Sequence, residues 1–362
     1  MLDPSKIVTW FDENFQLVRR SRRKTLASVV GGAMKMQGTG VLALGRAMEG
    51  ETSAKHCIKR VDRFLGNEQL EVHALSAALF ALLRGRNRHP VVLVDWTDRH
   101  DFQQLVFALS KDGRALPFLC VTIKKHAFEC VTEGRQIEAE RHGLELLAAL
   151  CPAEVRPILI ADRGFGNWRW IGDVTKWGWL FVQRLAKNHR METEQFTGVL
   201  SELGIRRGWL PRDWGWGTLG EAGQGRMRLV TVYDRKAKGP WYLVTNIEDA
   251  SPKAVVGLYA KRMWIEAMFR DLKSRKWGLG IDDVKLGDLG RTTRHFMVVA
   301  IAYILLCAFG AIAEVKDLAR TLKANTVKRR TLALAAIGNN LIRWLSRTSI
   351  PRALRQLVSL PT

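Results

Sequence analysis

Pro90-Val-Val-Leu-Val94 is an uninterrupted apolar run that leads directly into Asp95. A second run of the same kind, Pro157-Ile-Leu-Ile-Ala161, leads into Asp162. Short continuous apolar runs predict strands that are buried on both faces, as in a parallel sheet covered by helices. Functional side chains converge at the ends of adjacent strands in such a sheet, so we expect Asp95 and Asp162 to lie side by side at one edge.

The segments around these runs predict the rest of an α/β core. Two apolar segments, 105–109 and 117–123, flank Asp112-Gly113, a pair typical of a hairpin turn. An amphipathic helix is expected over 133–150, another helix from about Asn167, and a strand over 179–185. Residues 87–185 are therefore predicted to form a mixed sheet with helical crossovers.

The chain on either side of this segment has other patterns. Residues 1–86 show helical periodicity, and residues 186–250 are rich in Gly and Trp with alternating apolar positions. From residue 251 the pattern is helical to the end. We predict a helical DNA-binding domain over 1–86, a β-rich insertion over 186–250, the second part of the core over 251–318, and a basic helical region over 319–362 that includes Lys328-Arg-Arg330.

The net charge favours a polyanion as partner. Lys and Arg number 57 against 35 Asp and Glu, a formal net charge of +22 in 362 residues, which attracts phosphate backbones. In the first domain Lys55, Lys59, Arg60 and Arg63 have helical spacing and could meet a duplex; a solvated basic face is the alternative.

Two further features bear on the cellular compartment. The five cysteines show no zinc-binding spacing, so we expect reduced thiols in a cytoplasmic protein, and no secretory signal is visible at the amino terminus. Residues 296–313 contain no charged side chain and are long enough to cross a bilayer. A buried helix at the centre of a soluble protein fits them as well, and it is our prediction.

The segment from Tyr259 to Lys273 places four polar side chains at helical spacing. Tyr259, Arg262, Glu266 and Lys273 are separated by three, four and seven residues. At about 100° per residue they fall within roughly 60° of one helix face, so that a phenol, two cations and a carboxylate point the same way. The alternative for Glu266 is a surface ion pair with Arg262 or Arg270.

Asp95, Asp162 and Glu266 together suit phosphodiester chemistry. Two divalent cations about 4 Å apart need several carboxylates; one cation activates a water or a 3′-hydroxyl, and the other stabilises the leaving oxygen. An all-oxygen site favours Mg²⁺, and we expect Mn²⁺ to be able to replace it. Each Asp alone has a common alternative, because an Asp that ends a strand is often a turn former or a helix cap.

In combination these features resemble the cut-and-paste bacterial transposases of the IS4 family, which have an RNase H-like catalytic core. The resemblance covers nearly the whole chain. It rests on the Asp after Val91-Val-Leu-Val94, the Asp in Ala161-Asp-Arg-Gly-Phe165, the β-rich insertion, and a Tyr-x2-Arg-x3-Glu-x6-Lys signature. It implies an α/β fold with DNA-binding helices before the core and further helices after it.

The resemblance also implies roles for individual residues. Catalysis and metal ligation fall to Asp95, Asp162 and Glu266. Contacts with phosphates of the transposon end fall to Tyr259, Arg262 and Lys273, and stacking on a flipped base of a hairpinned end falls to Trp241. A place in the sheet core is the alternative for Trp241.

We therefore expect a DNA transposase that excises an element through a hairpin intermediate and transfers its strands by hydrolysis and transesterification on two metal ions. The expected partners are terminal inverted repeats and target DNA, bound by a homodimer at the nucleoid in the bacterial cytoplasm, with no membrane. Two alternatives stay open. One is an RNase H-like nuclease that cuts without joining, and the other is a domesticated DNA-binding protein that has lost catalysis.

Overall fold

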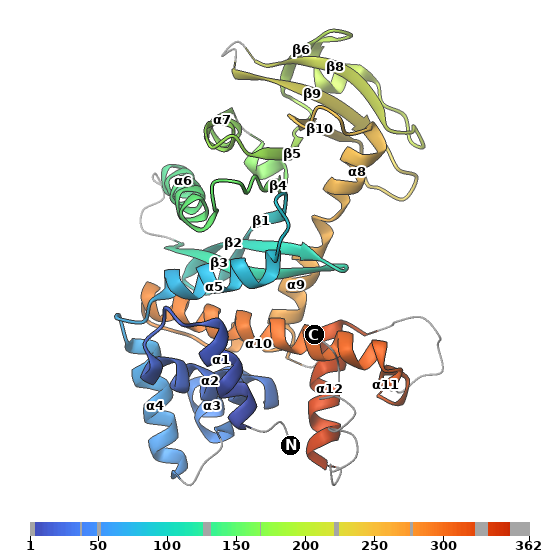
Figure 1. Ribbon diagram of the computed structural model, residues 1–362. Helices are drawn as coiled ribbons and strands as arrows, with labels where there is room; N and C mark the ends of the chain where they lie inside the picture. Colours follow the sequence, from blue (N-terminus) through green and yellow to red (C-terminus); the bar gives the residue numbers. More distant parts are fainter. Residues whose placement is uncertain are drawn as a thin grey trace. The chain divides into compact units, whose positions relative to one another are not determined.

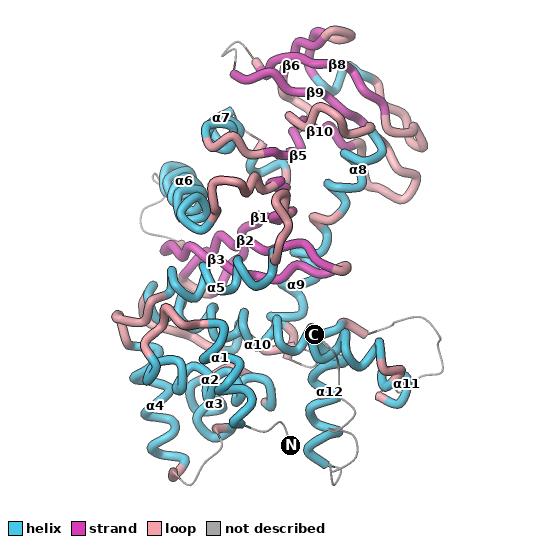
Figure 2. Tube along the Cα trace, viewed as in Figure 1, coloured by secondary structure: helices cyan, strands magenta, loops and turns pink. Residues whose placement is uncertain are grey.

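The computed structural model describes residues 4–36, 38–48, 52–125, 132–166, 168–220, 224–275, 278–322 and 332–347. The chain divides into two compact units. The sheet unit is Leu79–Met268, and the helical unit combines Met1–Ala78 with Phe269–Thr362 (Figure 1). Helices occupy both end regions of the described chain and strands its middle, as expected from the hydrophobic patterns (Figure 2).

The sheet unit contains one mixed sheet of ten strands among the described residues. In chain order the strands are β1 (Val91–Arg99), β2 (Phe102–Lys111), β3 (Arg114–Lys124), β4 (Ile158–Ala161), β5 (Leu180–Leu185), β6 (Arg190–Thr193), β7 (Thr197–Val199), β8 (Arg212–Leu219), β9 (Gln224–Val232) and β10 (Trp241–Thr245). Their order across the sheet is β3-β2-β1-β4-β5-β10-β9-β8-β6-β7. The β-rich character predicted for residues 186–250 is confirmed, and these strands extend the same sheet beyond β5.

Strands β1, β4 and β5 are parallel to one another, and β2, β3 and β10 are antiparallel to their neighbours. The apolar run of β4 is almost wholly buried, as its lack of alternation predicts. Asp112 and Gly113 both have positive φ, 48° and 78°, which matches the two-residue turn expected between β2 and β3. The predicted mixed sheet with helical crossovers is thus confirmed.

One expected strand end is wrong. The parallel pairing of β1 with β4 stops at Val94 and Ala161, but β1 continues past Asp95 to Arg99 because β2 pairs with it along that whole length. Asp95 therefore lies inside strand β1, at the point where the neighbouring strand β4 ends. Asp162 does follow its strand directly, as expected.

Helices α6 (Thr132–Leu150), α7 (Trp168–Lys176) and α8 (Pro252–Ala260) pack on the sheet. Helix α6 contacts β2, β3 and α7, and α8 contacts β5, β9 and β10. The helices predicted over 133–150 and from about residue 167 are confirmed. Ser251 caps α8, since its hydroxyl accepts a hydrogen bond from the Ala254 amide at 3.2 Å.

The helical unit draws on both ends of the chain. From the first end it has α1 (Pro4–Asn14), α2 (Arg20–Lys35), α3 (Val41–Ala47), α4 (Ala54–Gly66) and the start of α5 (Val72–Arg84); from the other it has the end of α9 (Met263–Lys273), α10 (Leu289–Val315), α11 (Leu318–Thr321) and α12 (Leu334–Arg347). The fully buried His295 of α10 joins the two ends, because its Nε2 lies 2.7 Å from the Thr39 carbonyl oxygen. The basic segment 328–330 lies outside the described residues.

Helix α10 contains the apolar segment that raised the membrane alternative. Among the described residues it is the one helix that passes a length and hydropathy test for a membrane span. Of its most apolar 18-residue stretch, 72% is buried within the protein, against α2, α4 and α12. Gly310 and Gly338 allow close approach to α12, because a Cβ atom at either would collide with a carbonyl oxygen of the other helix. The helix thus has the burial expected of a core helix.

Candidate active site

Asp95 and Asp162 are brought together by strand register. Each follows one of the paired residues Val94 and Ala161, so the two carboxylates come from adjacent parallel strands. Asp95 is mostly buried, with 15% of its side chain exposed, and Asp162 is 31% exposed. The Asp162 carboxylate also accepts a hydrogen bond from the Gly164 amide at 2.7 Å and so caps the short helix η1 (Arg163–Phe165).

Glu266 reaches the same place from α9. The signature segment is not the single continuous helix expected from its spacing, because α8 ends at Ala260 and α9 begins at Met263. The two helices join through tighter hydrogen bonds between residues three apart, such as Arg262 N to Tyr259 O at 2.9 Å and Ile265 N to Arg262 O at 3.1 Å. Arg262 lies in this turn and Glu266 in the first turn of α9.

Arg262 lies between the three acids. Its Nη2 atom is 3.4 Å from Asp162 Oδ2 and 3.9 Å from Asp95 Oδ2, while Nη1 donates to Glu266 Oε1. The guanidinium is 13% exposed, and its Nε has no hydrogen-bond partner among the described atoms. The structure therefore brings Asp95, Asp162 and Glu266 together around one buried cation. The ion-pair alternative raised for Glu266 is also present in this arrangement.

Burial and the neighbouring charges shift the pKa values of Asp95 and Arg262. Burial raises the pKa of Asp95 to about 6; Arg262 opposes this effect, and the charges of Asp162 and Glu266 add to it. Burial works against the charged form of Arg262, but the carboxylates around it, Asp95 first, raise its pKa overall.

Tyr259 and Trp241 form an aromatic pair beside this cluster. Their ring centroids lie 4.9 Å apart with planes at 74°, an edge-to-face contact. Tyr259 is only 3% exposed, and its pKa is raised, mainly by burial. Arg184 of β5 lies beside the Tyr259 hydroxyl and donates a hydrogen bond to the Pro240 carbonyl at 3.2 Å. Trp241, at the start of β10, is half-buried.

Lys273, the last residue of the signature, belongs to the helical unit. It ends α9 and forms an ion pair with Asp282, with Nζ 3.6 Å from Oδ2. The other predicted site residues all lie in the sheet unit.

The donor set fits a hard divalent cation. Three carboxylates supply only oxygen donors, which Mg²⁺ prefers. No group of three or more acidic, His or Cys side chains in the described ranges has its donor atoms placed to hold a metal ion. In this structure the positive charge that balances the acids is the Arg262 guanidinium.

Two buried polar residues that bond to the segments carrying Asp95 and Asp162 escaped prediction. Gln183 of β5 is 1% exposed, and its amide donates to the backbone carbonyl of Asp162, which fixes the strand end that carries this acid. Glu140 of α6 is 8% exposed and accepts a hydrogen bond at 3.1 Å from the indole Nε1 of Trp96, which follows Asp95 in β1. The only sequence signal for Gln183 was a polar residue next to Arg184 within a mainly apolar strand.

The mixed sheet, with one acid inside β1, a second directly after the adjacent parallel strand β4 and a third on a following helix, is consistent with an RNase H-like transposase core. Residues 110–305, more than half of the chain, match the family described as Transposase DDE domain. The chain belongs to this family of DDE-type insertion-sequence transposases. Asp162 and Glu266 lie inside the matched range, and Asp95 precedes it. No curated protein matches the chain.

Membership supports a coarse description of activity. DDE transposases are enzymes that bind DNA, and they use divalent metal ions, generally Mg²⁺. The expectation of a DDE-type transposase is therefore confirmed at this level.

Proposed function

We propose that this protein is a cut-and-paste transposase of the IS4 type, with Asp95, Asp162 and Glu266 as its catalytic acids. The supporting observation is the convergence of the three carboxylates, from β1, β4 and α9, on Arg262. A single acid on the protein surface would not require two further acids and a buried cation beside it. One mostly buried acid and two partly exposed acids around one buried cation fit a site where a bound metal ion can take over the role of that cation.

In this proposal the three acids hold Mg²⁺, or Mn²⁺ in its place. Two such ions would supply an activated water or 3′-hydroxyl and stabilise the leaving oxygen. Gln183 keeps the Asp162 carbonyl fixed, and the Gly164 amide orients the Asp162 carboxylate. The acids are thus held by backbone and neighbouring side chains before DNA arrives, which lowers the cost of organising the site.

Arg262, Lys273 and Tyr259 are proposed to act on phosphates of the transposon end. Arg262 balances the acids in this structure and is the cation nearest to where a scissile phosphate would be held. Tyr259 is buried beside Arg184, so we propose that it acts at a phosphate through that guanidinium. Lys273, 35% exposed, contributes from the end of α9.

Excision through a hairpin intermediate is proposed with Trp241 as the stacking platform for a flipped base. Its contact with Tyr259 holds the ring beside the acidic cluster while leaving it partly exposed. Trp241→Ala should reduce the hairpinned product on denaturing gels, and Trp241→Phe, which keeps an aromatic face, should largely restore it. Equal hairpin yields from all three proteins would count against this role.

The proposed partners are terminal inverted repeats and target DNA, bound by a homodimer in the bacterial cytoplasm at the nucleoid. DNA binding by the helices of residues 1–86 is part of the proposal. It is supported by their basic residues and by the net charge of +22.

The test is incubation of the purified protein and its Glu266→Ala variant with DNA that carries both element ends and a supercoiled target, with and without Mg²⁺. Metal-dependent excision and joining by the unmodified protein alone is the expected result. Cleavage without joining would favour an RNase H-like nuclease, and binding without cleavage would favour a DNA-binding protein that has lost catalysis.

A further inference from the structure

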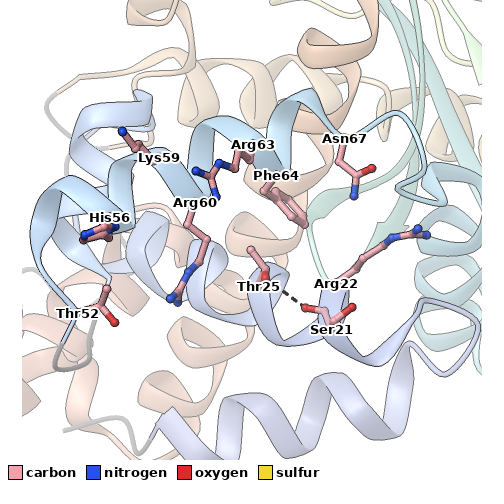
Figure 3. Close-up of a pocket in the computed structure, with 10 residues that line it drawn as sticks. All are labelled: Ser21, Arg22, Thr25, Thr52, His56, Lys59, Arg60, Arg63, Phe64 and Asn67. Atoms are coloured by element: carbon pink, nitrogen blue, oxygen red, sulfur yellow. Dashed lines mark hydrogen bonds between the residues drawn. The ribbon is translucent and has the colours of Figure 1, made fainter.

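A cationic pocket lies within the helical unit, between α2 and α4 (Figure 3). It has a volume of about 640 Å³. Its lining residues are Ser21, Arg22, Thr25, Thr52, His56, Lys59, Arg60, Arg63, Phe64 and Asn67. The lining therefore combines four Lys and Arg side chains with hydroxyl and amide groups, and it contains no acid.

The cations of α4 follow from the two faces of that helix. Cys57, Val61, Phe64 and Leu65 are buried on one face. His56, Arg60 and Arg63, spaced by four and three residues, lie exposed on the other. The seven helical steps from His56 to Arg63 span roughly 10 Å along the helix axis. Each strand of DNA carries one phosphate per about 3.4 Å of duplex axis, so this face can meet more than one phosphate.

The polar groups of the lining are arranged as donors. Arg22 is held in the wall by Gln69 and Glu71, with its Nη2 2.8 Å from Gln69 Oε1. The side-chain oxygen Oδ1 of Asn67 accepts a hydrogen bond from the backbone amide of Gln69 at 3.1 Å. The side-chain NH₂ group of Asn67 is therefore left for a ligand. Lys59, Arg60 and Arg63 have no ion-pair partner among the described residues. Unneutralised cations and free donors around an open pocket are suited to phosphate oxygens.

We infer that this pocket binds the sugar-phosphate backbone of duplex DNA without reading its sequence. The inference rests on the proposed function and adds to it the surface that takes DNA in the first 86 residues, the face of α4 together with α2. A volume of this size holds a ligand much larger than one inorganic phosphate ion. A run of backbone phosphates matches both the volume and the spread of cations.

The test is fluorescence anisotropy of a labelled duplex with the full-length protein, Arg60→Gln/Arg63→Gln, and the matched control Lys316→Gln/Arg320→Gln. The control removes two exposed positive charges from the same unit. Titrations at several salt concentrations give the slope of log affinity against log salt, and thermal melting by circular dichroism checks folding.

For the pocket variant we expect the magnitude of the slope to decrease by about two, and the affinity for any duplex sequence to fall. For the control we expect the slope and the affinity to change by no more than a general charge effect. Equal slopes for the pocket variant and the control would overturn the inference. Tight one-to-one binding of inorganic phosphate, with DNA binding unaffected by the variant, would also overturn it and indicate a small-anion site. Failure of the unmodified protein to bind any duplex would instead count against the proposed function.

Discussion

Arg262 and Asp162 are 100 residues apart in the chain, yet Arg262 Nη2 lies 3.4 Å from Asp162 Oδ2. The same guanidinium also balances Asp95 and Glu266. Arg262→Gln would leave three neighbouring carboxylates without a cation, so we expect it to destabilise the metal-free protein by about 3 kcal/mol at pH 7.5. Added Mg²⁺ should restore stability to the variant by more than it stabilises the unmodified protein.

Urea unfolding with and without Mg²⁺ measures both effects. Arg163→Gln is the matched control, because Arg163 is exposed and adjacent to Asp162. We expect it to change stability by less than about 0.5 kcal/mol. If Arg262→Gln and Arg163→Gln behaved alike, Arg262 would not be the charge that compensates the acids.

Asp162→Asn should abolish metal-dependent DNA cleavage while leaving the fold intact. Asparagine keeps an oxygen to accept the Gly164 amide but loses the charge that a metal ligand needs. The expected loss exceeds about a hundred-fold, since even partners of metal ligands cost 10- to 100-fold. Asp98→Asn, which removes the charge that pairs with Lys125 but keeps an oxygen to accept from Gln103, should cleave normally. Residual cleavage by Asp162→Asn near the level of Asp98→Asn would refute the assignment.

Metal binding should depend on pH through Asp95. Its pKa of about 6 means that below pH 6 a bound cation must displace a proton, whereas above pH 6 the carboxylate is already charged. The logarithm of the Mn²⁺ affinity should therefore rise by about one per pH unit up to pH 6 and then level off. Titration calorimetry between pH 5 and 8 measures this. A pH dependence that disappears in Glu140→Gln would point to Glu140 as its source.

Glu140 itself should make stability fall as pH rises. Burial raises its pKa from 4.5 to about 7, with the Trp96 hydrogen bond opposing the shift. Between these two values the folded protein holds a proton that the unfolded chain has released, so the free energy of unfolding decreases with rising pH. Above pH 7 the cost is complete, on the order of 3 kcal/mol.

Glu140→Gln should remove this cost, because glutamine is neutral and keeps an oxygen for the Trp96 indole. Urea unfolding at pH 5 and pH 8 should show the variant more stable than the unmodified protein at pH 8 only. Glu145→Gln, at an exposed position of the same helix, is the control and should change little. If Glu140→Gln did not raise the free energy of unfolding at pH 8, the charged form of Glu140 would not destabilise the folded protein.

The sequence was most informative where a pattern has one physical cause. The apolar runs before Asp95 and Asp162 favour strands buried on both faces, as is typical of parallel strands covered by helices, and β1 and β4 pair in parallel as this predicts. The juxtaposition of the two acids followed from that. Spacing was enough to place Arg262 and Glu266 near one another, since four residues make about one helical turn.

The remaining features depend on neighbours that one segment does not reveal. β1 continues past Asp95 because β2 pairs with it, and no local signal distinguishes this from a strand end. The turn between α8 and α9 contains neither Gly nor Pro, so periodicity alone predicted one helix. The contact of Gln183 with the Asp162 carbonyl arises from the pairing of Ala161 with Gln183 across the sheet.

The pairing of Val94 with Ala161 also determines where the chain can change length. A single residue inserted or deleted just before either acid would turn its side chain to the opposite face of the sheet. The segment between β5 and β10 has no such constraint. Its strands β6 to β9 lie on one side of β10 in the sheet, and the strands that carry the acids lie on the other side. Length variation between copies of this element, and fusions of foreign peptides, should therefore be tolerated in the loops between β6 and β9 and rejected in the few residues around Asp95 and Asp162.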